Sequence, residues 1–233
     1  MLSDTMSPSD FDYGVKLDCG GVIIHGDGAN VKRPFDDIPV ELHELSPGVI
    51  PSEDSGVCGF SGQLGFIDFT TEMRLPRHVH IGPNKSTHPD AEQRLLVERI
   101  LVLNGFAMVE MCGELYIIPP KTLVHIPPGV PHTWTACPKG VDMNAALGLI
   151  TQEAMVSEGK FLMVYEYEDP TSFCPTKQTH VLKSMDEYEA ASPEDLQSIM
   201  IPALEAKEVK ERCWFAWQRQ VKKYAHVSGE TDI

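Results

Sequence analysis

The chain has 233 residues, of which 42% are hydrophobic and 23% are charged, a composition that indicates an ordinary globular protein and excludes general disorder. Its formal charge is -15, and no basic stripe offsets the acidic surface, so nucleic acid is excluded as a partner. Residues 1–8 lack a basic start and an apolar run, and no apolar stretch of about 18 residues occurs, so neither a signal peptide nor a membrane span is predicted and a cytoplasmic location is expected.

Residues 1–12 are polar and acidic, and they predict a flexible arm. A single β-barrel domain is expected over residues 13–170, where short β-type runs alternate with turn residues at the spacing of an all-β sandwich or barrel. The predicted strands are residues 15–17, 21–25, 40–45, 63–70, 99–103, 106–111, 115–118, 122–126, 133–136, 146–151 and 161–167. A parallel β/α sheet is rejected, because helical periodicity between the strands is absent before about residue 183.

Two tight turns are predicted between these strands. Residues 111–115 indicate a hairpin turn around Gly113, and Pro119-Pro120-Lys121 indicates a second turn. We expect the two turns together to set the strands of the site side by side.

The last part of the chain, residues 171–233, is predicted to carry helices. Ser192-Pro193-Glu194-Asp195 supplies a capping Ser and a Pro at the first helical position, which is a good helix start. An apolar stripe interrupted at Pro202 predicts one short helix and then a longer one over about 202–223. Three aromatic side chains near its end are expected to pack outside the barrel or on a partner chain: Trp214, Phe215 and Trp217.

Six cysteines are scattered along the chain without a Cys-x-x-Cys pair. This spacing argues against a zinc knuckle, a redox dithiol or a compact disulfide framework. We therefore expect small buried hydrophobic side chains at these positions. They are Cys19, Cys58, Cys112, Cys137, Cys174 and Cys213.

Three imidazoles and one carboxylate stand in segments that are predicted to form adjacent strands: His78, His80, Glu98 and His132. Successive side chains of a strand point to opposite faces, so His78 and His80 project from one face and can reach one ion together. Nitrogen-rich ligation with a single carboxylate suits a first-row transition metal better than Mg or Ca, which prefer oxygen ligands. The pattern therefore predicts a transition-metal site.

These residues resemble the two conserved motifs of the cupin superfamily, in which a His-x-His strand is followed by a Glu that stands seven residues before a Gly. A later Pro-x-Gly-x-x-His closes the site. Here Glu98 and Gly105 have the first spacing, and residues 127–132, Pro-Pro-Gly-Val-Pro-His, match the second motif. The resemblance covers roughly residues 60–140.

The sequence departs from the family pattern at two turns and in the second motif. Glu72 stands at the usual leading Gly of the first motif, and Lys121 stands where the second motif has its first Gly. Ala136 replaces a common Asn. These departures concern turns and packing.

A further departure is the length of the segment between His-x-His and Glu98, which is 17 residues (81–97) where the family has three or four. Because of this insertion, Glu92 or Asp90 is an alternative fourth ligand. Residues 82–93 are rich in Gly, Pro, Asn, Ser and Thr, and they predict a flexible flap at the barrel mouth. His88 within it is interpreted as a solvent-exposed side chain, with a lid role over the metal as the alternative.

The resemblance implies an all-β, cupin-type antiparallel β-barrel or jelly roll with C-terminal helices. It also implies four ligands for one divalent transition metal: His78, His80, Glu98 and His132. Fe(II) is the first choice, with Mn, Ni, Cu or Zn as alternatives. The family includes dioxygenases, decarboxylases, isomerases, cyclases and epimerases, so the fold does not choose among reactions.

Two residues are candidates for proton transfer, Glu98 itself and His125, which lies seven residues before His132. The alternative for His125 is a packed or surface histidine. Trp134 shares the strand parity of His132, which makes it a candidate wall of the pocket or an ordinary core residue.

Two functional classes remain. The first is a metal enzyme, which intact ligands favour because buried imidazoles without a metal would carry unsatisfied polar atoms. In overall style the chain is similar to single-domain cupins found beside fungal polyketide synthases, which implies oxidation of a small aromatic or polyketide-derived intermediate in secondary metabolism. An isomerase, cyclase or decarboxylase is the non-oxidative alternative. The second class is a non-catalytic small-molecule-binding barrel, and self-association into a homodimer is an open option in either class.

Overall fold

The computed structural model describes residues 15–16, 22–23, 30–47, 62–83, 93–149, 154–217 and 220–223. Several expectations lie outside these residues: those for the arm 1–12, most of the flap 82–93 including His88, the alternative ligands Glu92 and Asp90, and Cys19 and Cys58. The four cysteines that the structure describes are free thiols. Cys137 and Cys213 are buried as expected, whereas Cys112 is exposed and Cys174 is half-buried, so the expectation of burial is wrong at those two positions.

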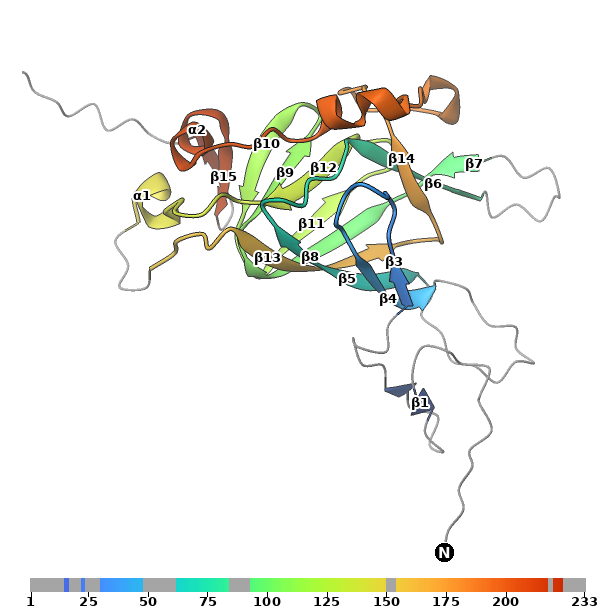
Figure 1. Ribbon diagram of the computed structural model, residues 1–233, viewed down its shortest axis with the longest axis horizontal. Helices are drawn as coiled ribbons and strands as arrows, with labels where there is room; N and C mark the ends of the chain where they lie inside the picture. The colour runs from blue at the N-terminus through green and yellow to red at the C-terminus, as the bar shows by residue number, and fades with distance from the viewer. Residues whose placement is uncertain are drawn as a thin grey trace, which may run out of the picture.

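The fold consists of two facing β-sheets that enclose the core (Figure 1). The six-stranded sheet has the order β11 (Thr122–Ile126), β8 (Glu98–Gly105), β13 (Lys160–Tyr167), β5 (Gln63–Thr70), β4 (Leu42–Pro47) and β3 (Asn30–Lys32). The eight-stranded sheet has the order β14 (Ser172–Pro175), β6 (His78–Pro83), β12 (His132–Ala136), β9 (Ala107–Met111), β10 (Glu114–Ile118), β15 (Trp214–Trp217) and β16 (Gln220–Lys223), and β7 (Gln93–Leu95) pairs with β6. A separate pair joins β1 (Val15–Lys16) to β2 (Val22–Ile23). The predicted all-β jelly-roll class is confirmed, although the two sheets do not close into a continuous barrel.

The core lies between the sheets and follows from the alternation of side chains along each strand. In β13, every second residue is buried, and the same holds for β5, which pairs with it over eight residues. Phe69 and Phe161, directly opposite in that pair, stack with ring centroids 4.9 Å apart. Such cross-strand aromatic pairs fix the register, because a slip of one residue would turn the apolar set to solvent.

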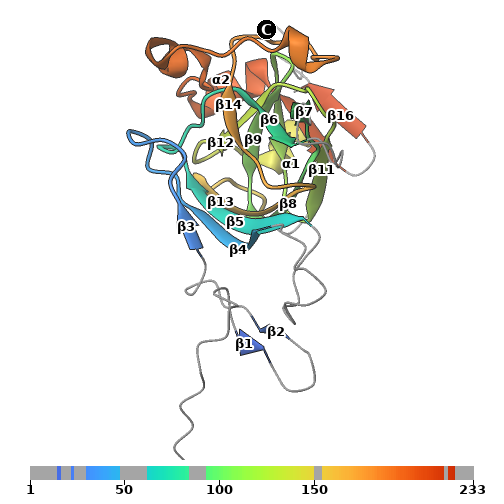
Figure 2. The same cartoon turned by 90° about the vertical axis from the view of Figure 1, so that its right-hand side faces the viewer.

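The outer face of the eight-stranded sheet is covered by the C-terminal part of the chain (Figure 2). The helical elements are α1 (Met143–Leu147), the 3-10 helices η3 (Met185–Glu187) and η4 (Pro193–Ile199), and α2 (Ala206–Arg212). The short helix expected after Ser192 is confirmed as η4. A second apolar cluster joins side chains of β9 and β10 to residues of α1, α2 and β15.

The longer helix expected over 202–223 is wrong. Helix α2 ends at Arg212, and Trp214 begins strand β15, which runs parallel to β10 with Trp214 opposite Tyr116. The open edge of β10 offers backbone partners, and Phe215 is fully buried against the sheet when the segment is extended. The aromatic cluster, expected outside the barrel or on a partner chain, therefore forms a strand of the sheet itself, with Phe215 buried in the second apolar cluster.

The strand expected over 146–151 is also wrong where the structure describes it, because residues 143–147 form helix α1. The Asp142 carboxylate accepts hydrogen bonds from the backbone N–H groups of Asn144 and Ala145, and Gly148 ends the helix with φ 67°. This cap satisfies the free N–H groups of the first turn, which favours helix over strand.

Of the two predicted turns, the one around Gly113 is confirmed as the hairpin between β9 and β10, with φ 51° at Cys112 and 83° at Gly113. The turn at Pro119-Pro120-Lys121 instead leads from β10 in one sheet to β11 in the other. It therefore links the two layers, and the strands that it joins are not neighbours.

Both motif glycines are required by backbone geometry. Gly105 has φ 71°, and a Cβ there would lie 2.1 Å from the carbonyl oxygen of Lys160. Gly129 has φ 77°, and its Cβ would lie 2.1 Å from the carbonyl oxygen of Leu182. The left-handed conformation and the close backbone approach each exclude a side chain, so these two glycines help to place the strands that carry the site.

We predict that Gly105→Ala lowers the free energy of unfolding by about 3 kcal/mol, because the strained φ and a backbone clash add together. Gly140→Ala is the matched control: Gly140 has φ 86° but open space around its Cβ position. It should cost only about 1 kcal/mol. Denaturant unfolding of both variants measures the difference, and equal losses would contradict the role of the Lys160 contact.

Lys121 adopts φ 65°, a left-handed conformation that costs a residue with a Cβ about 1 kcal/mol. We predict that Lys121→Gly raises the free energy of unfolding by about 0.5 kcal/mol, the strain relief exceeding the added entropy of the unfolded chain. The thermal midpoint should rise by roughly 1 to 2 °C. A lower midpoint would show that the Lys121 side chain contributes more than its backbone strain costs.

Candidate metal centre

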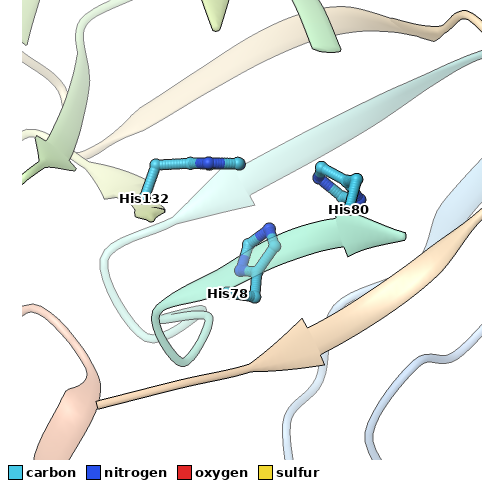
Figure 3. Close-up of side chains that lie close together, drawn as sticks. All are labelled: His78, His80 and His132. Carbon is cyan, nitrogen blue, oxygen red and sulfur yellow. The ribbon is translucent and has the colours of Figure 1, made fainter. Parts of the chain in front are cut away.

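The three histidines come together on the inner face of the eight-stranded sheet. His78 in β6 lies directly opposite His132 in β12, the neighbouring strand, and His80 follows two residues further along β6. Figure 3 shows the three rings facing a common space. The ring centroids of His78 and His132 are 4.5 Å apart, and those of His78 and His80 are 5.0 Å apart. All three side chains are buried.

Backbone carbonyls fix the orientation of two of the rings. Nδ1 of His78 lies 2.7 Å from the carbonyl oxygen of Pro76, and Nδ1 of His132 lies 2.9 Å from that of Val130. A neutral imidazole that donates Nδ1–H to a carbonyl carries its lone pair on Nε2. Both rings are therefore held with the free nitrogen toward the cluster, in the way that backbone hydrogen bonds orient metal-binding histidines.

The donor atoms fit a metal ion. One nitrogen from each of His78, His80 and His132 lies within 4.8 Å of the others, and the Nε2 atom of each is buried with no hydrogen-bond partner among the residues that the structure describes. Two ligands about 2.0–2.1 Å from one ion are at most about 4.2 Å apart, so the widest-spaced nitrogens would draw together by some tenths of an ångström when an ion binds. Buried polar atoms are rarely left without a partner, so the arrangement fits a bound cation.

Glu98 reaches this cluster from the opposite sheet. It is the first residue of β8, and its side chain is 3% exposed. Its Oε2 atom lies 2.8 Å from Nε2 of His132 and 3.5 Å from Nε2 of His80. With the His132 proton on Nδ1, Nε2 and Oε2 are two acceptors that face each other, a pair that a shared cation satisfies. The fold thus brings together all four ligands predicted from the sequence, three from one layer and one from the other.

The titration behaviour of these groups suits cation binding. Burial lowers the pKa of His78 well below its usual value, with help from the neighbouring His132 and His80 rings. Burial also lowers the pKa of His80. For Glu98, burial raises the pKa, but His80 and His132 outweigh it and hold the pKa well below the ordinary range. Neutral imidazoles beside an ionised carboxylate are the protonation states in which these side chains bind metals.

Two aromatic side chains, Tyr167 and Phe173, line the cluster, and the sequence analysis identified neither of them as a site residue. The Tyr167 ring lies 4.3 Å from the His80 ring, and Phe173 lies 4.5 Å from His78 and 5.4 Å from His80. Tyr167 is directly opposite Glu98 in the β13–β8 pair. Burial, and next the charge of Glu98, raise the pKa of Tyr167 well above its usual value, so its hydroxyl stays protonated. The only sequence signal was the inward parity of Tyr167 on a predicted strand.

His125 is not part of this site, which contradicts its assignment as a pocket base. It lies in β11, exposed, while its neighbours Val124 and Ile126 point into the core. The strand alternation that turns those two inward necessarily turns His125 outward. Trp134 is fully buried in the core cluster between the sheets, so its interpretation as ordinary core fits its placement.

No family model matches the sequence, and no curated protein matches it. Solved structures do match. An ethanolamine utilization protein Q from Salmonella typhimurium is 17% identical, with 68% of this chain and 93% of that chain covered and a TM-score of 0.37. The polyketide cyclase RemF from Streptomyces resistomycificus is 13% identical, with coverages of 69% and 87% and a TM-score of 0.39. A double-stranded β-helix protein from Klebsiella pneumoniae is 12% identical, with coverages of 71% and 99% and a TM-score of 0.39.

Similarities of this size carry no argument about family or activity. The two facing sheets and the meeting of both sequence motifs at one buried cluster are the arrangement that the resemblance to the cupin superfamily implies. No helix in the described part of the chain is long and apolar enough to cross a membrane.

We predict that His132→Ala removes most of the bound metal, because loss of one of three imidazoles lowers affinity at least about tenfold while the sheets keep their core. His125→Ala is the matched control and should retain full metal content, since that side chain lies on the outer surface. Elemental analysis after dialysis, beside circular dichroism of each variant, measures both effects. Stoichiometric metal in folded His132→Ala protein would refute the assignment.

Glu98→Gln is predicted to weaken metal binding by about tenfold or more, because the neutral amide removes the anionic oxygen nearest His132. Glu92→Gln should leave the dissociation constant unchanged within about twofold. Competition with a chromogenic chelator measures both constants. The reverse order of effects would move the fourth ligand into the 81–97 insertion.

Proposed function

We propose that this chain is a metal-dependent enzyme of the cupin type that oxidises a small aromatic or polyketide-derived molecule. The observation that carries the proposal is the convergence of three buried Nε2 atoms that no described residue satisfies. Each unsatisfied buried polar atom costs about 1–3 kcal/mol. A purely structural role for this cluster would therefore lower the stability of the fold, whereas in a metal site the same three nitrogen atoms would bind the ion.

The donor set supports Fe(II) as the metal, with Mn, Ni, Cu or Zn as alternatives. Three imidazoles and one carboxylate form a mixed nitrogen and oxygen set of the kind that first-row transition metals prefer. Four protein ligands leave room for further ligands on an ion that takes six. Bound Fe(II) would supply the one-electron chemistry that lets dioxygen react with an organic substrate.

The residues around the donor atoms support an aromatic substrate. Tyr167 and Phe173 present ring surfaces next to His80 and His78, and such surfaces bind flat apolar molecules and exclude water. The protonated Tyr167 hydroxyl can donate a hydrogen bond to an oxygen atom near Glu98. The Glu98 carboxylate, whose Oε2 atom lies 2.8 Å from Nε2 of His132, stands where it could take up a proton from a bound phenol or enol.

The test uses protein purified without chelators, whose metal is identified by elemental analysis before oxygen uptake is measured with a panel of phenols and polyketide-like enols. We expect iron as the main metal and oxygen consumption that depends on substrate. Oxygen uptake by Glu98→Gln should fall by about 100-fold or more, as expected when both metal binding and proton acceptance are impaired.

Two results would redirect the proposal. Turnover under strict anaerobiosis by Zn-loaded protein would favour a non-oxidative isomerase, cyclase or decarboxylase at the same site. Tight ligand binding without turnover for any metal would favour a non-catalytic binding barrel.

A further inference from the structure

A cleft of about 790 Å³ lies where three segments of the chain meet at the surface. The segments are the loop between β3 and β4 (residues 34–39), the connection between β5 and β6 at Glu72 and Arg74, and η4 with the residues that follow it to Pro202. We call this the η4 cleft. Clefts that bind small molecules enclose about 300–1,000 Å³, so its volume suits a small ligand.

The walls of the η4 cleft are mostly apolar and are fixed in place. The backbone N–H of Arg77 donates to the carbonyl oxygen of Ile199 at 2.8 Å, and Pro76 pairs with Met200 in an isolated β-bridge, so the η4 wall is joined to the start of β6. Four prolines restrict the backbone of the lining: Pro34, Pro39, Pro193 and Pro202. A preformed wall of this kind loses little entropy when a ligand binds.

An aromatic pair separates the η4 cleft from the metal cluster. Phe35 lines the cleft and packs edge to face on Phe173, with ring centroids 5.8 Å apart. Phe173 in turn packs on His78 on the side of the metal cluster. None of the four predicted metal ligands lines the cleft. A molecule in the η4 cleft is therefore held by groups other than the metal ligands.

Arg74 differs from the other arginines that are partly buried in the described part of the chain. Arg77, Arg94 and Arg99 each form an ion pair with at least one carboxylate. Arg74 forms no hydrogen bond or ion pair with any described residue, and its Nε atom is buried. Partly buried arginines are usually paired with an anion. Because Arg74 lines the η4 cleft, its guanidinium group is placed to pair with a carboxylate of a ligand.

Three exposed carboxylates also line the η4 cleft: Asp36, Asp37 and Glu72. None of them forms an ion pair with Arg74 or with another described residue. They repel a ligand that carries only negative charge, and they attract an ammonium group. The cleft thus combines a guanidinium group, an acidic rim and an apolar surface.

We propose that the η4 cleft binds a small apolar zwitterion, of the class of apolar amino acids and short apolar peptides with free ends. The ligand carboxylate pairs with Arg74, its ammonium group lies beside the acidic rim, and its apolar part contacts Phe35 and Leu196. Arg74 is suited to this role because a guanidinium group matches the planar shape of a carboxylate. The acidic rim then selects against a carboxylate that lacks the ammonium group.

The first experiment titrates the full chain with three probes while amide resonances are followed by nuclear magnetic resonance. The probes are the dipeptide L-leucyl-L-phenylalanine, its methyl ester, which lacks the carboxylate, and its N-acetyl derivative, which lacks the ammonium group. We expect saturable shifts at the residues of the η4 cleft. The dipeptide should bind about tenfold or more tightly than the ester, and about threefold more tightly than the N-acetyl derivative.

The second experiment repeats the titration with charge variants whose folding is checked by circular dichroism. Arg74→Gln should weaken the dipeptide to the level of the ester and leave the ester unchanged. Arg33→Gln is the matched control, because Arg33 is exposed, pairs with Glu41 and does not line the cleft. Asp36→Asn/Asp37→Asn should weaken the dipeptide and strengthen the N-acetyl derivative, since the rim attracts one probe and repels the other.

The third experiment separates this site from the metal chemistry proposed above. His132→Ala should bind the dipeptide as tightly as the wild type does, because His132 is not part of the η4 cleft. Four results would overturn the proposal: no saturable shift with any probe up to about 10 mM, an ester that binds the wild type as tightly as the dipeptide, an N-acetyl derivative that binds more tightly than the dipeptide, or a folded Arg74→Gln protein that still prefers the dipeptide to the ester.

Discussion

The pairing of β6 with β12 at His78 and His132 is the contact on which the rest of the site depends. Each of these histidines begins its strand, and each places Nδ1 against the carbonyl oxygen two residues earlier in the chain. The segments just before the two strands therefore orient the His78 and His132 rings in the same way. Once the strands pair, the Nε2 atoms of His78 and His132 face the same space, and His80 joins them because a strand returns to the same face after two residues.

The local part of this arrangement could be predicted from the sequence. A period of two places His78 and His80 on one face, and the motif spacing selected His132. The positive φ values at Gly105 and Gly129 explain why the motif glycines stand where they do. Lys121, which stands where the motif has a glycine, adopts the same left-handed conformation. This departure from the motif therefore adds backbone strain at Lys121 but keeps the turn.

The long-range part could not be predicted, because it depends on which strands become neighbours. Tyr167 reaches the site through the β13–β8 register, and Phe173 reaches it because β14 pairs with β6 at His80. Neither pairing has a signal within the segment itself. The same reason explains why the helix predicted over residues 202–223 is wrong. Its apolar pattern is helical, but the open edge of β10 pairs with the end of this segment and holds it as a strand. The assignment of His125 to the pocket was wrong for a simpler reason. His125 is two residues from Leu123 on the same strand, so both side chains point to the same face, and Leu123 is exposed.

The 81–97 insertion shows how a long departure from the motif can leave the centre unchanged. Strand β7 pairs antiparallel with the end of β6, Ile81 opposite Leu95, so the insertion leaves and re-enters the sheet at the same place. The backbone N–H of Leu96 then donates to the carbonyl of His80 at 2.9 Å, and Arg94 forms ion pairs with Glu168 and Asp169 just after β13. Because the excursion closes on itself, its length adds only a slowly growing entropic cost. Glu98 begins β8 directly after this closure, with its Oε2 atom 2.8 Å from Nε2 of His132.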